Sequence, residues 1–271
     1  MMNKRPATRT YRRALITGAS SGIGCAIVEA LPSGTSLLLS GRDSDGLARL
    51  ATELEGRGRI VEVVAADLST DAGRDGVAAA GERFEVDLFV CNAGQGPYGA
   101  FANTEEAVLR AAVEVNVVAP LLLLRRLLPG MIARARADGM RAGVIVTSSE
   151  VGFFPVPYLA TYAASKAFDL SLAEALAAEH ARDPVDILAL CPTATRTGFA
   201  PRSGFGGNLP GAQSPATVAR AALGALGRQR TLAVGPISGG VPAVPALVRA
   251  GIAQAIALAL RRTVRSGDAQ M

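Results

Sequence analysis

The chain has 271 residues, of which 49% are hydrophobic and 19% charged, which fits one large α/β domain and excludes a disordered chain. Aromatic residues make up only 4% and tryptophan is absent, which argues against the binding of single-stranded nucleic acid by stacking. The net charge of +5 is scattered along the chain rather than gathered in a recognition motif, so we expect no nucleic-acid partner.

Short apolar runs bounded by turn residues alternate along the chain with longer segments of helical periodicity. The runs are rich in Leu, Ile and Val, as in strands buried on both faces, and predict strands at Ala14–Thr17, Ser36–Ser40, Ile60–Ala65, Asp87–Cys91, Gly143–Ser148, Asp186–Leu190 and Thr231–Val234. The segments between them predict helices at Gly22–Leu31, Asp43–Glu55, Thr70–Gly81, Glu105–Ala137, Leu159–Arg182 and Pro215–Arg228. This alternation predicts an α/β fold, a doubly wound parallel sheet of about seven strands with helices on both faces.

The ends of the chain and one internal segment depart from this rhythm. Residues 1–12 are polar and basic and are expected to be flexible, whereas residues 13–271 are expected to form a single domain. Residues 193–214 contain five glycines and predict a long loop near the substrate. An apolar segment predicts a C-terminal helix over residues 246–262.

A glycine-rich turn, Thr17-Gly-Ala-Ser-Ser-Gly-Ile-Gly24, follows the first predicted strand and leads into the first predicted helix. Its glycines let the backbone turn tightly and approach a pyrophosphate, and the helix N-terminus supplies free N–H groups. The alternative is an ordinary turn, but the place after the first strand favours a dinucleotide site. The residues expected to bind the dinucleotide here are Gly18, Ser20, Ser21, Gly22, Ile23 and Gly24.

The second predicted strand ends at Ser40-Gly41-Arg42-Asp43. In dinucleotide-binding folds an acidic residue at this strand end binds the ribose 2′-hydroxyl, whereas an arginine accommodates a 2′-phosphate. Gly41 stands at the position of the acid and Arg42 follows it, so we expect NADP(H) rather than NAD(H) as cofactor. The alternative is a solvated Arg42 beside an Asp43 that caps the second helix.

A serine, a tyrosine and a lysine in the second half of the chain stand at spacings that could bring them together for proton transfer. Ser149 follows the fifth strand, Tyr162 comes thirteen residues later, and Lys166 lies four residues further along the same helix face. A free phenol has a pKa of about 10, and a nearby ammonium favours the phenolate and eases proton exchange. The alternative is a packing tyrosine beside a surface lysine, which the glycine-rich turn makes much less plausible.

Together these motifs resemble the short-chain dehydrogenase/reductase family over roughly residues 12–235. Further matches are Asn92-Ala-Gly94 after the fourth strand, Asp67 after the third, and Asn116 where the family has its catalytic asparagine. The chain has Pro192-Thr193 where the family often has Pro-Gly. The resemblance implies a Rossmann fold, with further cofactor-binding residues at Asp67, Leu68, Asn92, Ala93, Gly94, Tyr162, Lys166, Pro192, Thr193, Thr195 and Thr197.

The resemblance also implies a mechanism, in which hydride passes between a nicotinamide and a carbonyl carbon. Tyr162 then exchanges a proton with the carbonyl oxygen, and Ser149 holds and polarises that oxygen. Lys166 binds the nicotinamide ribose and lowers the pKa of Tyr162, while Asn116 anchors a water in the proton relay. The expected catalytic residues are therefore Asn116, Ser149, Tyr162 and Lys166.

The substrate is expected to contact aromatic residues in the segments that flank this site. The candidates are Ser149, Tyr98, Phe154, Phe199 and Phe205, and they indicate an apolar carbonyl or alcohol substrate. The alternative is that these rings only pack beneath the loop. Arg196 and Arg202 could meet an anionic group, but we interpret both primarily as solvated.

The leading hypothesis is an NADP(H)-dependent oxidoreductase that transfers a hydride between the nicotinamide and a carbonyl or secondary alcohol. An alternative on the same site is a 3-oxoacyl-thioester reductase. An alternative of another class is a non-catalytic dinucleotide-binding sensor or scaffold, which would not need the Ser149, Tyr162 and Lys166 set.

The remaining expectations concern metals, location and assembly. One histidine and three widely spaced cysteines give no metal-ligand pattern, so no metal is expected. With no secretory signal and no apolar stretch of about 20 residues, a cytoplasmic protein without a transmembrane segment is expected. The helices predicted at 105–137 and 159–182 are the usual subunit contacts of the family, so we expect a homodimer or homotetramer.

Overall fold

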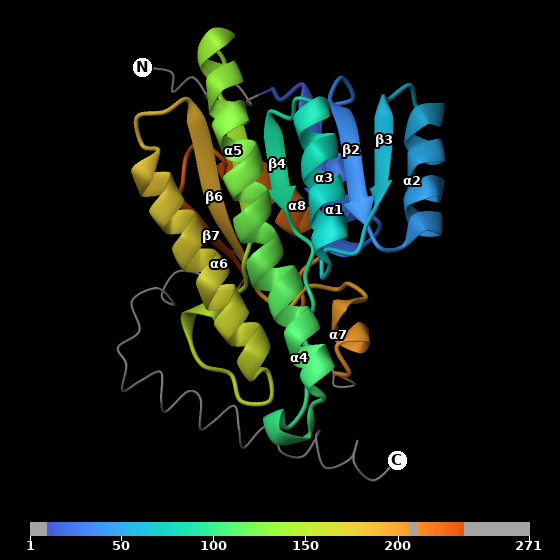
Figure 1. Ribbon diagram of the computed structural model, residues 1–271, viewed down its shortest axis with the longest axis vertical. Coiled ribbons are helices and arrows are strands. Elements are labelled where there is room, and N and C mark those ends of the chain that lie inside the picture. Colours follow the sequence, from blue (N-terminus) through green and yellow to red (C-terminus); the bar gives the residue numbers. More distant parts are fainter. Residues whose placement is uncertain (1–9, 206–210, 236–271) are drawn as a thin grey trace.

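The computed structural model describes residues 10–205 and 211–235, which build one seven-stranded parallel sheet. The strand order is β3-β2-β1-β4-β5-β6-β7, so the direction of winding reverses between β1 and β4 (Figure 1). The bounds are β1 Arg13–Thr17, β2 Ser36–Gly41, β3 Val61–Ala65, β4 Leu88–Cys91, β5 Ala142–Thr147, β6 Val185–Pro192 and β7 Thr231–Val234. The seven predicted strands and the doubly wound sheet are therefore confirmed.

Helices cover both faces of the sheet, as predicted. One layer shares a buried cluster and consists of α3 Asp71–Arg83, α5 Ala119–Ala137 and α6 Ala160–Glu179. The opposite layer shares a second cluster and consists of α1 Gly22–Ala30, α2 Ser44–Gly56 and α8 Pro215–Ala225. The other helical segments are α4 Glu106–Val113, α7 Phe199–Arg202 and three single turns, η1 Phe101–Asn103, η2 Glu114–Val118 and η3 Glu150–Phe153.

Polar caps fix where several helices begin. The Asp43 carboxylate accepts a hydrogen bond from the Gly46 N–H at 2.9 Å at the start of α2. The Ser214 hydroxyl accepts one from the Thr217 N–H at 3.1 Å at the start of α8, where Pro215 occupies the first turn. Such caps satisfy N–H groups that have no partner within the helix, so these starts are encoded locally.

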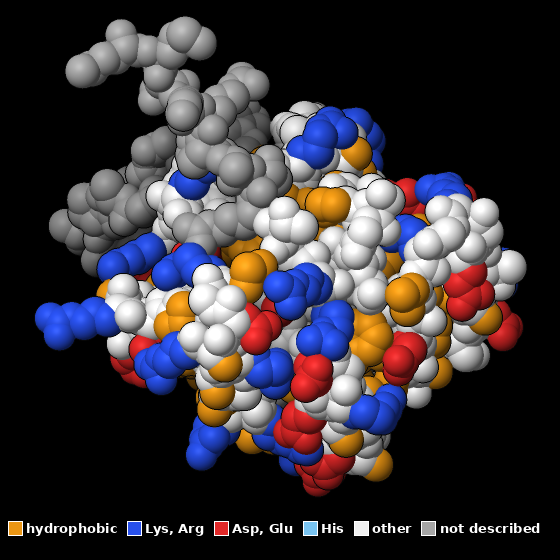
Figure 2. All heavy atoms as spheres, turned by 90° about the horizontal axis from the view of Figure 1, so that it is seen from above, with side chains coloured by type: hydrophobic (Ala, Val, Ile, Leu, Met, Phe, Trp, Pro, Cys, Tyr) orange, Lys and Arg blue, Asp and Glu red, His pale blue; other side chains and the backbone are white. Residues whose placement is uncertain are grey.

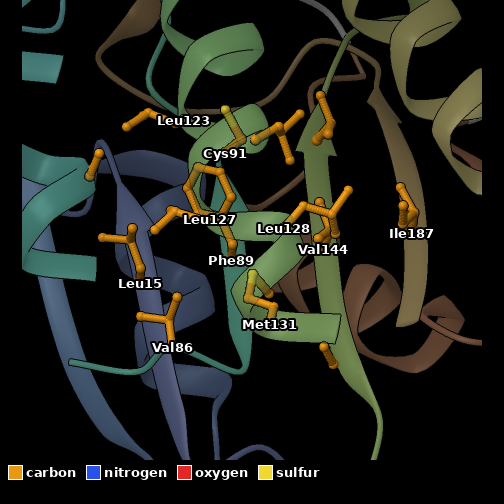
Figure 3. Close-up of a cluster of buried hydrophobic side chains, with 14 of the residues drawn as sticks. Leu15, Val86, Phe89, Cys91, Leu123, Leu127, Leu128, Met131, Val144 and Ile187 are labelled. Carbon is orange, nitrogen blue, oxygen red and sulfur yellow. The ribbon is translucent and has the colours of Figure 1, made fainter. Parts of the chain in front are cut away.

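Strand β4 lies at the centre of the sheet and is buried on both faces. Phe89 and Cys91 belong to the cluster beneath α3, α5 and α6, whereas Leu88 and Val90 belong to the cluster on the opposite face. This alternation follows from the two-residue period of a strand. Figure 3 shows the Phe89 ring close to Met131 of α5, in the middle of the first cluster.

The single helix predicted over Glu105–Ala137 is wrong in detail, because η2 separates α4 from α5 as a turn of π-helix. The Ala119 N–H donates to the Glu114 carbonyl, five residues back instead of four. Pro120 follows, and it has no N–H to donate to the Asn116 carbonyl in a regular α-helix. The proline therefore gives a physical reason for the wider turn, which is of a kind frequent at functional sites.

The α4–η2–α5 segment is also long and apolar enough, by length and composition alone, to cross a membrane. It is the only segment of the described residues with these properties. Its side chains at Leu123, Leu127 and Met131 are buried against the sheet and α3, as in a core helix of a globular domain.

The outer strand β3 is not buried on both faces, contrary to the prediction. It lies at one edge of the sheet, where Val63 is 39% exposed and Glu62 faces Arg83. Over the part of the surface drawn in colour, Figure 2 shows basic and acidic side chains interspersed. Pairs such as Arg126 with Glu82 match this pattern, which resembles an ordinary solvated surface rather than a field of one sign.

Several predicted boundaries also change. The helix predicted over Leu159–Arg182 is shorter and ends at Glu179, while the loop predicted over 193–214 contains the short helix α7. Most of the predicted basic N-terminus, part of that loop at 206–210, and the helix predicted over 246–262 lie outside the described residues.

The central packing of Phe89 yields a test of the core. Phe89 is fully buried, so Phe89→Ala should lower the free energy of unfolding by about 3–5 kcal/mol, through lost burial and the cavity left behind. Phe101 is 63% exposed, so the matched variant Phe101→Ala should change it by less than about 0.5 kcal/mol. Denaturant unfolding followed by circular dichroism measures both, and equal effects would contradict this description of the core.

Candidate active site

The glycine-rich turn joins β1 to α1 and leaves no space for side chains at its glycines. Gly18 and Gly22 adopt φ angles of +66° and +59°, which favour glycine. A Cβ atom on Gly24 would lie 2.2 Å from the Gly18 carbonyl oxygen and 2.7 Å from Asn92 Nδ2. Ser21 forms no side-chain cap on α1, so the N–H groups of the first turn of α1 remain available to an anionic ligand.

The segment after β4 is fastened to this turn. The Asn92 side-chain amide donates to the Thr17 carbonyl oxygen at 3.1 Å, and the Asn92 and Ala93 N–H groups donate to Thr17 Oγ1 at 3.0 and 3.1 Å. These bonds join β1 to β4 where the winding of the sheet reverses. Ligands of open α/β sheets bind at this switch point, outside the carboxyl ends of the strands.

A cavity of about 270 Å³ opens beside the glycine-rich turn, and we call it the Arg42 cavity. Its wall is lined by eight of the predicted cofactor-binding residues, namely Gly18, Ser20, Ser21, Arg42, Asp67, Leu68, Ala93 and Gly94. The other residues in its wall are Gly41, Asp43, Ala66, Gln95, Val115 and Arg202.

Arg42 is exposed at the rim of this cavity. Within residues 10–205 and 211–235 its guanidinium forms no hydrogen bond or ion pair, and the neighbouring Asp43 caps α2. Asp67 also lines the cavity, and its pKa is lowered, chiefly by a hydrogen bond from the Ser69 N–H and also by the charge of Arg42. The cavity therefore combines a basic group that can meet an anion with an ionised carboxylate.

A second cavity of about 380 Å³ lies next to the first, and we call it the Tyr162 cavity. Ser149, Tyr162 and Lys166 all line it, together with predicted cofactor residues from the glycine-rich turn, from the segment after β4 and from the segment after β6. Five residues line both cavities, which are Gly18, Ser21, Ala93, Gly94 and Arg202. The two cavities thus share a wall.

Ser149 and Tyr162 come from different elements and meet at this cavity. Ser149 follows β5 and caps η3, where its hydroxyl accepts a hydrogen bond from the Val151 N–H at 3.4 Å. The Ser149 hydroxyl donates to the Pro192 carbonyl oxygen at 3.5 Å, and it also interacts with the Tyr162 phenol, near the start of α6, so that the pKa of the phenol is lowered. Two hydroxyl-bearing side chains therefore line one cavity, where a substrate oxygen could bind.

Burial is the largest influence on the Tyr162 phenol and raises its pKa above the ordinary value. The charge of Lys166 and the hydrogen bond with Ser149 both lower it. The prediction that Lys166 favours the phenolate is therefore correct in sign, but burial outweighs this effect. Tyr162 keeps its proton to a higher pH than a free tyrosine, which suits a proton donor.

Lys166 is buried one helical turn after Tyr162. Its ammonium donates to the Thr147 carbonyl oxygen at 2.8 Å and to Asp169 Oδ2 at 2.9 Å, and lies 5.9 Å from the centre of the Tyr162 ring. Burial alone lowers the pKa of Lys166, but the negative charge of Asp169 and then that of the ionised Tyr162 outweigh burial, so the net pKa is raised. The sequence analysis missed Asp169, because nothing in the sequence distinguishes this carboxylate from one on a solvated helix face.

Asn116 lies behind the cavity wall, in the π-helical turn η2, and is fully buried. Its side-chain amide donates to the Gln95 carbonyl at 2.7 Å and to the Ser165 hydroxyl at 2.9 Å, and its side-chain oxygen accepts from the Gln95 N–H at 2.8 Å. The Asn116 side chain therefore joins the segment after β4 to α6. It does not face the Tyr162 cavity, and Gly24 is likewise absent from the walls of both cavities.

The segment after β6 completes the Tyr162 cavity with Pro192, Thr193, Thr195 and Thr197. The Thr193 N–H donates to the Val234 carbonyl at 3.0 Å and so continues the pairing of β6 with β7. A Cβ on Gly235 would lie 2.1 Å from the Thr193 methyl carbon. Gly235 thus makes room for the threonine that stands where the family often has glycine.

The aromatic residues predicted to contact substrate separate into two groups. Tyr98, Phe199 and Phe205 line the Tyr162 cavity, and the Phe199 ring centre lies 5.2 Å from that of Tyr162. Phe154 does not line it, so the structure does not bring Phe154 together with the other three aromatic residues. Neighbouring side chains of an extended segment point in opposite directions, and the sequence does not reveal which one faces a cavity.

Two charged residues of the cavity walls escaped the sequence analysis or were interpreted differently. Glu150 follows Ser149 and lines the Tyr162 cavity, where burial raises its pKa and a hydrogen bond from the Ala194 N–H lowers it. Arg202, interpreted from sequence as solvated, is exposed on α7 but also lines both cavities. An arginine at the boundary of two cavities is suited to an anionic group that spans them.

Comparison with known sequences agrees with this geometry. The family model for short chain dehydrogenase matches residues 12–204. A very-long-chain 3-oxoacyl-CoA reductase of Kluyveromyces lactis is 33% identical over 181 residues, and the match covers 64% of this chain but only 52% of that protein. A putative ketoacyl reductase of granaticin polyketide synthase from Streptomyces violaceoruber is 34% identical over 202 residues, covering 73% of this chain and 72% of the relative.

Solved structures show the same relationship. A short-chain dehydrogenase from Sphingobium yanoikuyae in complex with NADPH superposes with a TM-score of 0.71 and 29% identity, covering 93% of this chain and 95% of the other. A short-chain dehydrogenase/reductase from Burkholderia phymatum in complex with NAD gives 0.72 and 27%, covering 83% and 89%. The chain belongs to the short-chain dehydrogenase/reductase family of oxidoreductases, which act on carbonyl and alcohol groups with a nicotinamide dinucleotide.

Proposed function

We propose that the protein is an NADP(H)-dependent reductase of apolar carbonyl compounds, or a dehydrogenase of the corresponding secondary alcohols. The observation that carries this proposal is the meeting of Ser149, Tyr162 and Lys166 in a cavity that shares a wall with the Arg42 cavity. A protein that only sensed a dinucleotide would not need a serine and a tyrosine hydroxyl together in the cavity beside the shared wall.

The described residues fit a dinucleotide. The positive φ angles of Gly18 and Gly22, which line the cavities, and the uncapped first turn of α1 suit the close approach of a pyrophosphate. Arg202 stands at the shared wall, where it would bind the same phosphates, and Arg42 would meet a ribose 2′-phosphate. When bound, the cofactor supplies the hydride that the protein itself cannot provide.

The side chains of the Tyr162 cavity would handle the proton. Tyr162 is protonated at neutral pH, as an ordinary phenol is, and burial raises its pKa further, so it can donate a proton to the substrate oxygen during reduction. Ser149 orients that oxygen through its own hydroxyl. Lys166 holds the nicotinamide ribose and balances negative charge on the phenol, while Asn116 positions α6 through Ser165.

The substrate would be apolar at its far end. Tyr98, Leu159, Phe199 and Phe205 line the Tyr162 cavity and would exclude water from the reacting carbonyl. The two relatives described above are named for the reduction of 3-oxoacyl groups. A 3-oxoacyl thioester, with a carbonyl on an apolar chain, is therefore the second candidate substrate.

A substrate panel tests the proposed function. Purified protein with NADPH should reduce at least one of three classes of ketone, namely aromatic ketones, cyclic terpenoid and steroid ketones, and 3-oxoacyl thioesters, and the loss of NADPH absorbance measures the rate. The Tyr162→Phe variant should lower kcat by roughly 10²- to 10⁴-fold, because it removes the proton donor and little else.

Fluorescence titration with NADPH separates chemistry from binding in the same experiment. The Tyr162→Phe variant should bind NADPH nearly as well as the unchanged protein does. If NADPH bound tightly and no ketone were reduced, the sensor hypothesis would gain weight. Preference for thioesters over simple ketones would favour the second candidate.

The position of Arg42 predicts the choice between the two dinucleotides. Arg42→Ala should raise the Kd for NADPH by roughly 10- to 100-fold, because it removes a charge-assisted contact to the 2′-phosphate, and should hardly change the Kd for NADH. Arg49→Ala, on the exposed side of helix α2, which begins two residues after Arg42, serves as the charge-matched control. Equal weakening of both dinucleotides would contradict the NADP(H) assignment.

We also propose a homo-oligomer built through α4, α5 and α6. Val108, Val113, Leu121 and Leu122 of the first two helices are each about two-fifths exposed, which leaves apolar surface for a second copy. Light scattering of the purified protein should give the mass of a dimer or tetramer. A monomeric mass at micromolar concentration would contradict the proposal.

A further inference from the structure

The Lys166 ammonium has a buried counter-ion within its own helix. Asp169 lies three residues further along α6, its Oδ2 is 2.9 Å from Lys166 Nζ, and the two side chains are only 5% and 3% exposed. The other carboxylate oxygen, Oδ1, is buried and has no hydrogen-bond partner among the described residues. The carboxylate is therefore held at this place chiefly by the ammonium.

The charged and titratable groups around Tyr162 come from four elements. Lys166 and Asp169 lie on α6, and Glu150 begins η3. The thiols of Cys91 at the end of β4 and Cys191 near the end of β6 lie close enough to feel the Lys166–Asp169 pair, and burial raises the pKa of Cys191 to about 12. Both thiols stay neutral and add no negative charge. Among these five side chains Lys166 is the one cation, and Asp169 is the anion bonded to it.

We propose that Asp169 is a positioning residue that holds the Lys166 ammonium in place, and that its negative charge restrains Lys166 from ionising Tyr162. A lysine alone would favour the phenolate strongly in a site that excludes water, because buried charges are poorly screened. The nearby carboxylate opposes this effect. The Lys166–Asp169 pair is nearly neutral as a unit, and Tyr162 remains a phenol.

The negative charge of Asp169 determines the direction in which it shifts the pKa of Tyr162, the proton donor. The charge of Asp169 raises the pKa of Tyr162, after burial has raised it and Lys166 and Ser149 have lowered it. Tyr162 is able to donate a proton below that pKa and loses this ability as the pH rises through it. Asp169 thus extends the pH range in which the site can reduce a carbonyl, a consequence that rests on the proposed function.

Removal of the carboxylate should release this restraint. In Asp169→Asn the buried ammonium has no bonded anion, and the phenolate of Tyr162 becomes its nearest replacement. Tyr162 should therefore ionise at lower pH than in the unchanged protein. The alkaline decline in kcat/KM for ketone reduction should move to lower pH in parallel, with a loss on the order of tenfold at the alkaline end.

Tyrosinate absorbance provides a readout that needs no substrate. The chain has four tyrosines and no tryptophan, so an alkaline titration of the near-ultraviolet absorbance of the full chain reports phenolate formation clearly. The step that disappears in Tyr162→Phe belongs to Tyr162. This step should lie at lower pH in Asp169→Asn, both without ligand and with NADP⁺.

Matched variants separate charge from structure. Asp169→Glu keeps the charge and should largely restore the titration, whereas Asp169→Ser is a second uncharged variant in case Asp169→Asn does not fold. Asp186→Asn removes a buried carboxylate paired with Arg141 at the opposite end of β6, and should leave the Tyr162 step in place.

The outcomes distinguish this inference from the proposed function. A Tyr162 step that stays or rises in the folded uncharged variants would overturn the role of Asp169, whether or not a ketone is reduced. A rise would mean that Lys166 had lost its own proton instead. A step that moves down while no ketone on the panel is reduced would support Asp169 and count against the reductase proposal.

Discussion

The hydrogen bonds between Thr17 and Asn92 hold β1 against the segment after β4 at the point where the sheet reverses its winding. The reversal of strand order opens a crevice there, and the amide of Asn92 binds the glycine-rich turn at its edge. Gly24 packs directly against this amide, so a larger side chain at this position would separate the first helix from the segment after the fourth strand. The positions of both cavities follow from that junction.

Burial determines the electrostatics of the site more than the charges that sequence reveals. The phenol of Tyr162 and the ammonium of Lys166 both line the Tyr162 cavity, where loss of water opposes the ionised form of each. The Lys166 ammonium is paired with a carboxylate, and Tyr162 stays neutral because burial, together with the charge of Asp169, outweighs the charge of Lys166. The reactivity of the site is therefore a balance among three side chains on one helix.

The sequence predicts the sheet well, because each strand is a short apolar run and the starts of α2, α3 and α8 carry local caps. Prediction from sequence fails where the outcome depends on the direction of a side chain or on the residues that it contacts in the folded chain. Pro120 is compatible with the π-turn, but also with an α-helix that begins just before it, so the sequence alone does not reveal the π-turn that places Asn116 against Ser165. Phe154 and Phe205 look alike in sequence, yet only Phe205 reaches the cavity. Asp169 resembles a solvated helix residue until the fold places it beside Lys166.

The wall that the two cavities share limits which substitutions can change one cavity without changing the other. Gly18, Ser21, Ala93, Gly94 and Arg202 face both spaces, so a change at any of them alters two ligand sites at once. Tyr98, Val151, Leu159 and Phe205 face only the Tyr162 cavity. Mutation at these four positions can reshape substrate preference while the dinucleotide site is left intact. A chain built in this way can acquire new substrates by drift, one side chain at a time, without losing its redox chemistry.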